Sequence, residues 1–470
     1  MSRKNKKFNS VEIIDIGTKG LSIAKSVDGI VLMVKKGVPG DVVDVETYRK
    51  KKNYYLGNIT KYHSMSSLRT KAECEHFGTC GGCKWQDVIY DTQTDLKEKK
   101  IKHAIQNVFD NCKIEPIIKC ENQYFYRNKL EFSFTENRWL TNEEILNSGT
   151  DLERRGVGFH ISGMWDKVVD INKCHLQAEP SNEIRISIKN FAIKNDISFY
   201  NSRSKKGLLR SLMIRNTSLN QFMVIVQFYE NDLKNIELTL NHLKNNFKQL
   251  SSIQYIINSK DNDSIYDQTI NLFSGKKYIE EMIGELKFKI FPKSFFQTNI
   301  KQTIKLYQVV KDLANLTGNE IVFDLYSGLG TITQFLAKGA KKITGIESVN
   351  EAVISARESS IDNNINNVEY ETGDMKKIFT SEFISTHGNP DVIITDPPRE
   401  GMHKDVIKEI LNLDTKIIVY VSCNPPTQCR DLELLKIKYD ISKVQPVDMF
   451  PHTDHVENVV LLKLKNSLFY

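Results

Sequence analysis

The fold of this chain is decided by the stretch Asp324-Leu325-Tyr326-Ser327-Gly328-Leu329-Gly330. It closes a β-rich run over residues 321–325 and opens a helical pattern over residues 331–338. In this context a glycine-rich turn lets the backbone approach a bound ligand closely. Taken alone, the same glycines could also serve a plain strand-to-helix turn, so the segments around them must decide.

The pattern of strand followed by helix continues toward the C-terminus. The β-rich and helical segments alternate in the order β-rich 342–347, helical 350–363, β-rich 392–395 and β-rich 417–421. Such alternation predicts a doubly wound parallel sheet of the Rossmann-like α/β class.

Carboxylates follow the predicted strands where a nucleoside would need them. Glu347 ends the second strand, 17 residues after Gly330, and could accept both ribose hydroxyls. Asp374 follows the third β-rich run and could meet an adenine edge. This pattern leaves a dinucleotide open. Asp396-Pro397-Pro398 favours S-adenosylmethionine, because it resembles the substrate-facing motif of Rossmann-like methyltransferases, whereas Arg399 replaces the aromatic residue typical of amino-directed enzymes.

A cysteine lies about 25 residues further on, in Val421-Ser422-Cys423-Asn424-Pro425. A thiolate is the side chain best able to add to an electron-poor ring carbon, such as carbon-6 of uracil. That addition would make carbon-5 nucleophilic toward a methyl group, and a carboxylate must then remove the carbon-5 proton. We expect Glu457 to serve as this base.

Several motifs in a fixed order resemble the RNA 5-methyluridine methyltransferase family over nearly the whole chain. They are Phe295-Phe296-Gln297-Thr298-Asn299, Asp396-Pro397-Pro398-Arg399-Glu400-Gly401, Ser422-Cys423-Asn424-Pro425, Arg430-Asp431 and Phe450-Pro451-His452-Thr453-Asp454-His455-Val456-Glu457. The resemblance implies that Cys423 is the nucleophile and Glu457 the proton acceptor. It implies that S-adenosylmethionine is bound by Gln297, Tyr326, Glu347, Asp374 and Asp396.

Three of the eight cysteines cluster in Cys74-Glu75-His76-Phe77-Gly78-Thr79-Cys80-Gly81-Gly82-Cys83. Eight cysteines are too few for a secreted disulfide scaffold of this length, so metal binding or catalysis explains them better. The spacing leaves open a Cys₄ zinc site, with Cys112, Cys120 or Cys174 as the fourth ligand. Members of the family with this spacing hold a [4Fe–4S] cluster, and the resemblance implies Cys174 as its last ligand.

The N-terminal part alternates short β-rich runs with glycine turns over residues of about 9–63, which predicts a small antiparallel barrel with a hairpin turn at Gly37-Val38-Pro39-Gly40. The barrel resembles a TRAM domain, an OB-like module that binds RNA. We therefore expect three domains: the barrel over 1–64, a mixed iron–sulfur domain over 65–290, and the methyltransferase domain over 291–470. A helix expected at 91–109 could dock on the last of these.

The charge pattern favours RNA as the partner. The net charge is only +7, but lysine and arginine runs gather in the first half of the chain. Barrel and cluster together resemble the branch of the family that acts on 23S ribosomal RNA. Transfer RNA is the alternative substrate, and a non-catalytic RNA-binding iron–sulfur protein is the alternative class, which Cys423 and Glu457 argue against.

The remaining expectations concern RNA contacts and location. Arg127, Asn128 and Lys129 are predicted RNA contacts, and the target uridine must leave its stack to reach the thiol. No segment reaches the roughly 18 consecutive apolar residues of a membrane span, and the start lacks a signal-peptide pattern. We expect a cytoplasmic monomer that does not contact membranes.

Overall fold

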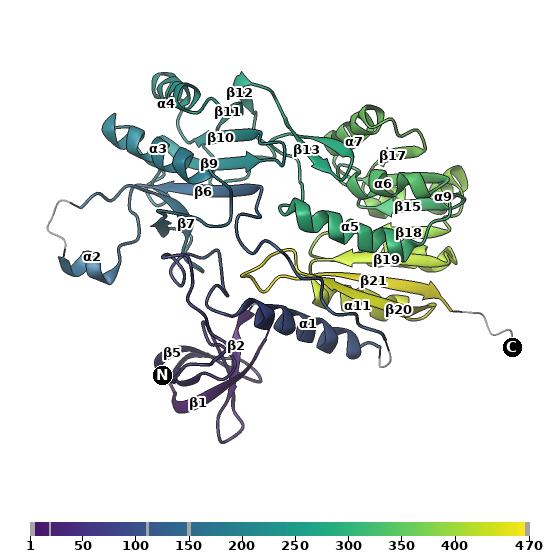
Figure 1. Cartoon of the computed structure of the whole chain (residues 1–470), viewed down its shortest axis with the longest axis horizontal. Coiled ribbons are helices and arrows are strands. Elements are labelled where there is room, and N and C mark those ends of the chain that lie inside the picture. Colours follow the sequence, from purple (N-terminus) through teal and green to yellow (C-terminus); the bar gives the residue numbers. More distant parts are fainter. Residues whose placement is uncertain (1–4, 18–19, 110–111, 148–151, 466–470) are drawn as a thin grey trace.

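The computed structural model describes residues 5–17, 20–109, 112–147 and 152–465. Its strands form a closed barrel, two seven-stranded sheets and a two-stranded sheet. These follow one another along the chain from the purple to the yellow end of the sequence in Figure 1. Among the described residues, no helix is long and apolar enough to cross a membrane.

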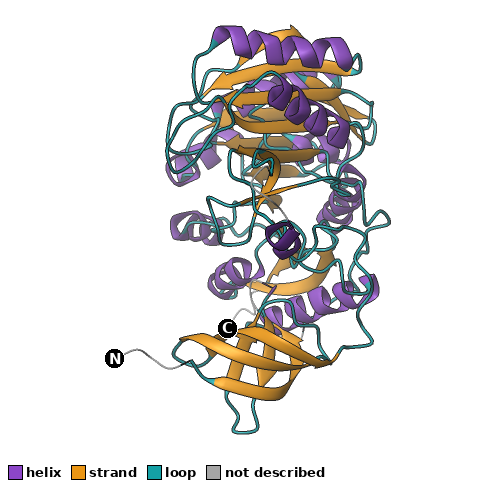
Figure 2. Ribbon diagram, turned by 90° about the vertical axis from the view of Figure 1, so that its left-hand side faces the viewer, coloured by secondary structure: helices purple, strands orange, loops and turns teal. Residues whose placement is uncertain are grey.

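The N-terminal segment forms the expected small barrel, which is closed by five strands and lies at one end of the molecule in Figure 2. Its strands are β1 (Lys7–Ile16), β2 (Ser22–Lys25), β3 (Val31–Val34), β4 (Val42–Lys50) and β5 (Tyr55–Ser64). Alternate residues such as Val11, Ile13, Val43 and Val45 fill its core.

The expected hairpin in the barrel is wrong. The turn at 37–40 joins β3 to β4, yet β5 lies between these two strands and pairs with β3 in parallel. The glycines and proline fix the local direction of the chain, but they do not choose the pairing partner, which is set by closure of the barrel.

The central sheet has the strand order β12-β11-β10-β9-β6-β7-β8. Its elements are β6 (Lys129–Thr135), α2 (Asn142–Asn147), β7 (Gly156–His160), β8 (Val168–Asp170), α3 (Ser181–Lys194), β9 (Leu209–Asn216), β10 (Phe222–Phe228), α4 (Leu233–Asn246), β11 (Leu250–Ile257) and β12 (Asn271–Gly275). Every residue of β10 is buried, because its two faces enter two different cores. Val224 and Val226 pack with α3 and α4, whereas Met223 and Ile225 pack toward the C-terminal sheet.

The C-terminal sheet has the order β17-β16-β15-β18-β19-β21-β20. Its strands are β15 (Ile321–Leu325), β16 (Lys342–Glu347), β17 (Val368–Thr372), β18 (Val392–Thr395), β19 (Ile417–Ser422), β20 (Tyr439–Val447) and β21 (Glu457–Leu464). The first five are parallel, as predicted. The last two are an unpredicted antiparallel addition, in which β21 inserts between β19 and β20.

Helices cover this sheet, and a small hairpin joins it to the central one. The hairpin is β13 (Ile279–Ile283) and β14 (Leu286–Ile290), and the helices are α5 (Ile300–Ala314), α6 (Thr331–Leu336), the 3₁₀ turn η2 (Ala337–Gly339), α7 (Asn350–Asp362), α8 (Met375–Ile378), α9 (Ser381–His387), α10 (Lys404–Asn412) and α11 (Pro425–Leu435).

One helix from early in the chain also belongs to this C-terminal core. Ile101 and Ile105 of α1 (Tyr90–Gln106) are fully buried in the same cluster as Leu432 and Leu435 of α11. The segment after α1 continues along β20, with isolated bridges that pair Ile114 and Ile118 with its residues. Helix α1 and residues 114–118 therefore pack against the sheet that lies 200 or more residues away in sequence.

Candidate active site

A cleft of about 1960 Å³ opens at the carboxyl ends of the C-terminal sheet. It lies where β15 is flanked by β16 on one side and by β18 on the other, the switch point at which α/β sheets bind ligands. The seven residues predicted to act in catalysis or cofactor binding all line it, namely Gln297, Tyr326, Glu347, Asp374, Asp396, Cys423 and Glu457.

The glycine-rich turn forms one wall of the cleft. Tyr326, Gly328 and Gly330 all have positive φ, at 68°, 56° and 69°. A Cβ on Gly330 would lie 2.4 Å from the Tyr370 hydroxyl, so only glycine fits there. The backbone N–H of Gly328 donates to Glu347 Oε2 at 3.0 Å, which fixes this carboxylate at the edge of the cleft. Its other oxygen, Oε1, accepts from the Ser348 hydroxyl at 3.0 Å and the Val349 N–H at 2.9 Å, so three of its four acceptor sites are filled.

Asp374 is placed at the cleft by a local cap. Its side chain accepts a hydrogen bond from the backbone N–H of Lys376 at 3.1 Å, at the start of α8. Asp324, beneath the turn, accepts one from the Thr333 hydroxyl at 2.5 Å, and its burial raises its pKa to about 7.

The thiol and the predicted base are brought together by strand register. Ser422 at the end of β19 pairs with Asn458 near the start of β21, so Cys423 and Glu457 lie at adjoining strand ends. Two buried amides lock this arrangement. The Asn458 amide donates to Gln428 Oε1 at 2.8 Å, and the Gln428 amide donates to the Tyr420 carbonyl at 3.0 Å.

Burial and charge set the proton affinities at this point. Burial, with a further contribution from Asp396, raises the pKa of Glu457 to about 8. Asp396 itself has a pKa raised to about 7 by burial and by Asp324. Burial and the charges of Glu457 and Asp396 raise the pKa of the half-buried Cys423 to about 11. Glu457 therefore binds a proton more strongly than an ordinary carboxylate, while the Cys423 thiol loses its proton less readily than an ordinary thiol.

Arg399 is the positive charge that opposes these shifts. Its presence lowers the pKa of both Cys423 and Glu457. The loop that carries it is tied to the start of α11, because the Arg399 carbonyl accepts hydrogen bonds from the Asn424 amide at 2.8 Å and the Thr427 hydroxyl at 3.0 Å. Arg399 therefore favours the thiolate at the place where a nucleophile is expected.

A second, smaller cavity of about 140 Å³ is lined by the four cysteines singled out from the sequence, Cys74, Cys80, Cys83 and Cys174. Backbone and side-chain donors point at the sulfurs: the Gly82 N–H reaches Cys80 Sγ at 3.4 Å and the Gln86 amide reaches Cys83 Sγ at 3.2 Å. Among the described residues, no group of three or more His, Cys, Asp or Glu is arranged to hold a metal ion.

The two other candidates for a fourth thiol lie elsewhere. Cys120 is buried and accepts a hydrogen bond from the Asn299 amide at 3.4 Å. Cys112 packs at the edge of the C-terminal core with Cys429.

The three residues predicted to contact RNA differ in their surroundings. Asn128 is buried, and its amide donates to the Gln297 carbonyl at 3.0 Å, so it is a packing residue that supports the cleft. Lys129 forms an ion pair with Glu131 at 2.5 Å. Arg127 lines the cysteine cavity, and its guanidinium lies 5.6 Å from the ring centre of Phe450, which lines the large cleft.

Known proteins share both the sequence and the architecture of this chain. A sequence model of the family described as tRNA (Uracil-5-)-methyltransferase matches residues 211–465. RNA methyltransferases of Bacteroides thetaiotaomicron and Porphyromonas gingivalis are each 46% identical to the chain, covering 96% of it and 100% and 99% of their own lengths. The chain belongs to this family of RNA methyltransferases.

A solved structure of the same kind agrees along the whole chain. The tRNA (uracil-54, C5)-methyltransferase of Pyrococcus abyssi, in complex with S-adenosyl-L-homocysteine, has a TM-score of 0.75 and 28% identity, and the match covers 98% of this chain and 100% of that one. The α/β part of the molecule therefore has the fold of an RNA methyltransferase whose solved relative binds S-adenosyl-L-homocysteine.

The charge of Arg399 generates a first prediction. Arg399→Gln should raise the pKa of Cys423 further, because it removes a positive charge that favours the thiolate. We expect slower alkylation of Cys423 by iodoacetamide at mildly alkaline pH, measured on its own peptide by mass spectrometry. Lys404→Gln, which changes an exposed residue of the same cleft, is the matched control. Equal alkylation rates in all three proteins would refute the electrostatic role of Arg399.

Proposed function

We propose that this enzyme methylates carbon-5 of uridine in RNA through a covalent bond between Cys423 and carbon-6 of the base. The observation that carries the proposal is the β19–β21 register, which brings a thiol and a buried, strongly basic carboxylate to one end of the S-adenosylmethionine cleft. All of these residues come from one chain, so the proposal requires no second copy.

The reaction divides between the two residues. The Cys423 thiolate adds its electron pair to carbon-6, and the electrons of the carbon-5 to carbon-6 double bond move into an enolate that makes carbon-5 nucleophilic. Bound S-adenosylmethionine supplies the methyl group as an electrophile. Glu457 then takes the carbon-5 proton, the enolate forms again, and the double bond returns as the sulfur of Cys423 leaves as thiolate.

The proposed donor site uses the carboxylates around the switch point. Glu347 accepts from the ribose hydroxyls at its remaining acceptor site and in place of the Ser348 hydroxyl. Asp374 serves the adenine edge, and Tyr326 shapes the turn. Asp396 lies close enough to the reacting groups for its charge to act on both, and Gln297 lines the same cleft; we propose that they contact the methionine portion or the base.

Two substitutions should stop the reaction at different points. Cys423→Ala should abolish methyl transfer and leave S-adenosylmethionine affinity nearly unchanged, since the thiol acts on the base. Glu457→Gln should allow addition and transfer but retain the carbon-5 proton, so a covalent RNA adduct should accumulate as a shifted band on a denaturing gel. Turnover should fall by about 10²-fold or more, the usual contribution of a general base. Cys429→Ala is the control for loss of a thiol. Full activity of Cys423→Ala would overturn the mechanism.

For the substrate we propose 23S ribosomal RNA, with the barrel as a TRAM-like RNA-binding module and domains over residues 1–64, 65–290 and 291–470. The combination of barrel and cysteine cavity supports this proposal. Transfer RNA is the second candidate, because the Pyrococcus abyssi enzyme, which the chain matches along its whole length, acts on uracil-54 of tRNA.

The substrate proposal is tested with purified enzyme and both RNAs. We expect methylation of large-subunit ribosomal RNA fragments and much slower methylation of unmodified tRNA; the reverse result would establish the tRNA alternative.

Replacing Lys50, Lys51 and Lys52 of the barrel by Ser should raise the RNA KM, with kcat less affected. It should also lower the salt slope of binding by about 0.9 for each phosphate that the barrel no longer neutralises. An unchanged salt slope would show that these three lysines do not contact phosphates of the RNA. Deletion of the barrel is less suitable, because Trp85 and Val88 pack against its Val38.

We also propose that Cys74, Cys80, Cys83 and Cys174 hold a [4Fe–4S] cluster. The proposal is supported by the chemistry of the donor set, because the four thiols line one small cavity and N–H groups donate to two of the sulfurs, although the thiols must draw closer together to hold a metal. Thiolates of this kind are the usual ligands of such a cluster, and bound iron would offset the raised pKa of these buried thiols.

Metal analysis tests the cluster. Protein purified without oxygen should be brown, with about four irons and four sulfides per chain. Cys174→Ser should lose the iron, whereas Cys112→Ser, which changes a cysteine away from the cavity, should keep it. Stoichiometric zinc without sulfide would show that the Cys₄ zinc alternative is right.

A further inference from the structure

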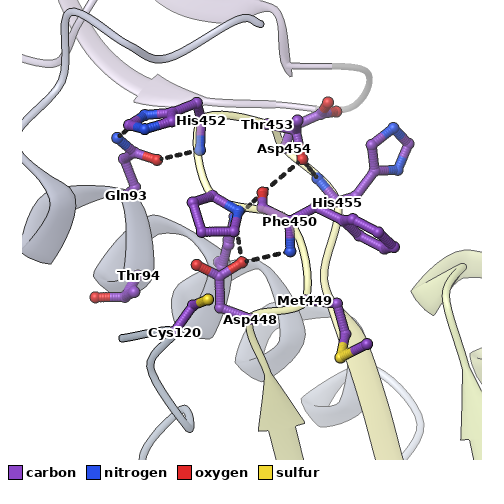
Figure 3. Close-up of polar contacts among 12 residues, drawn as sticks. Gln93, Thr94, Cys120, Asp448, Met449, Phe450, His452, Thr453, Asp454 and His455 are labelled. Carbon is purple, nitrogen blue, oxygen red and sulfur yellow. Dashed lines mark hydrogen bonds and ion pairs between the residues drawn. The ribbon is translucent and has the colours of Figure 1, made fainter. Parts of the chain in front are cut away.

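The loop that leads into the proposed base is held by residues from the other end of the chain. Residues 448–455, here called the base loop, connect β20 to β21 and end two residues before Glu457. Figure 3 shows this loop against Gln93 and Thr94 of α1 and against Cys120. The contacts join parts of the chain that are more than 300 residues apart in sequence.

A buried ion pair anchors the start of the base loop. Lys97 of α1 and Asp448 are both fully buried, with Lys97 Nζ 2.6 Å from Asp448 Oδ1. The same ammonium donates to the Phe450 carbonyl at 3.0 Å, and the Phe450 N–H donates to Asp448 Oδ1 at 3.1 Å. Asp448 Oδ2 accepts from the Tyr90 hydroxyl at 2.8 Å. Each oxygen of the carboxylate therefore has a fixed donor.

Such a pair is an inefficient way to stabilise a fold. Removing two charges from water costs much of what their attraction returns, and an apolar pair of similar size often serves stability equally well. Burial lowers the pKa of Lys97 even though Asp448 opposes the shift. What the pair does provide is direction, because an ammonium bonded to both the Asp448 carboxylate and the Phe450 carbonyl permits few positions of the backbone around it.

The middle of the base loop is held by Gln93. The His452 N–H donates to Gln93 Oε1 at 2.8 Å, and the Gln93 amide donates to the carbonyls of Trp85 and Val88 at 2.9 Å. His452 has φ of 64°, a left-handed conformation that is unfavourable for a residue with a side chain. The hydrogen bonds to Gln93 keep the backbone in this conformation.

The two ends of the base loop reach the cleft in which the reaction is proposed. Phe450 and Glu457 both line the cleft, one near each end of the held segment. In contrast, Cys423 is carried by β19 and α11, and Arg399 is held by α11. No hydrogen bond described for Lys97 or Gln93 reaches Cys423, Asn424 or Arg399.

We propose that Lys97 is a positioning residue for proton removal: through Asp448 and the base loop it holds Glu457 over the carbon-5 proton, with Gln93 acting on the same loop. This inference rests on the proposed function, because it assigns a step of that reaction. Helix α1 also packs on α11, but no hydrogen bond described for Lys97 reaches the thiol, whereas the loop that Lys97 anchors leads directly into Glu457. Disturbing Lys97 therefore affects the last step and leaves addition and methyl transfer in place.

The test is the covalent adduct. Lys97→Met should lower kcat by about tenfold or more, within the contribution of a general base, and should accumulate the methylated RNA adduct as Glu457→Gln does. The KM for RNA and the affinity for S-adenosylmethionine should change by less than about twofold. Lys102→Met, the same change at an exposed position of the same helix, should behave as the unaltered enzyme.

Two further variants keep the test decisive if Lys97→Met folds poorly. Lys97→Met with Asp448→Asn removes the uncompensated buried charge, and Gln93→Leu releases His452 without altering any charge; both should also accumulate adduct. Folded variants that lose turnover without adduct would overturn the inference and leave Lys97 a packing residue.

The proposed function fails separately from this inference. If folded Glu457→Gln itself gives no adduct, the assignment of Glu457 as the base is wrong, and the inference fails with it. If Glu457→Gln gives the adduct and the Lys97 and Gln93 variants turn over normally, only the inference is wrong.

Discussion

The candidate site depends on the antiparallel pairing of β21 with β19. Thirty-four residues separate Cys423 from Glu457 in sequence, and only this pairing brings them to adjoining strand ends. Val459 and Val460 of β21 enter two different apolar cores, so the register is fixed by burial on both faces of the strand. A shift of one residue would exchange those faces and move Glu457 away from the cleft. The geometry for chemistry is thus a consequence of hydrophobic packing.

The same burial acts in opposite senses on the two reacting groups. A low-dielectric setting makes Glu457 a better base, but it disfavours the Cys423 thiolate, and Arg399 at the open side of the cleft offsets this second effect. The raised pKa of Glu457 also changes how the stability of the fold depends on pH. A carboxyl whose folded pKa is raised from 4.5 to about 8 retains a proton that the unfolded chain loses, so its contribution to stability falls as the pH rises through that window. Part of the stability is given up at this position for basicity.

Much of this organisation could be predicted from the sequence, since local patterns carry it. The strand–turn–helix at Gly330 and the strand alternation predicted the parallel sheet, and the spacing of Glu347 and Cys423 placed both residues at its carboxyl edge. Partners far apart in sequence could not be predicted. The apolar run after Glu457 was a readable strand signal, but nothing local chose β19 as its neighbour. Lys97 lies in a lysine-rich run that predicts a solvated face, yet its partner Asp448 is 351 residues away and both are buried.

The base loop also links the two cavities. Thr453 lines the cysteine cavity, and Phe450, three residues earlier, lines the large cleft. Arg127 lines the cysteine cavity as well, and its guanidinium lies over the Phe450 ring. The backbone N–H groups of Lys84 and Trp85, directly after Cys83, donate to the His452 carbonyl at 2.8 and 3.1 Å. The cysteine loop is therefore hydrogen-bonded directly to the backbone of the base loop. Since the barrel packs on Trp85 through Val38, the N-terminal module and the reacting groups share one continuous set of contacts. In the proposed complex, the base loop and the segment from Cys83 to Lys97 lie between the barrel and the cleft that takes the uridine.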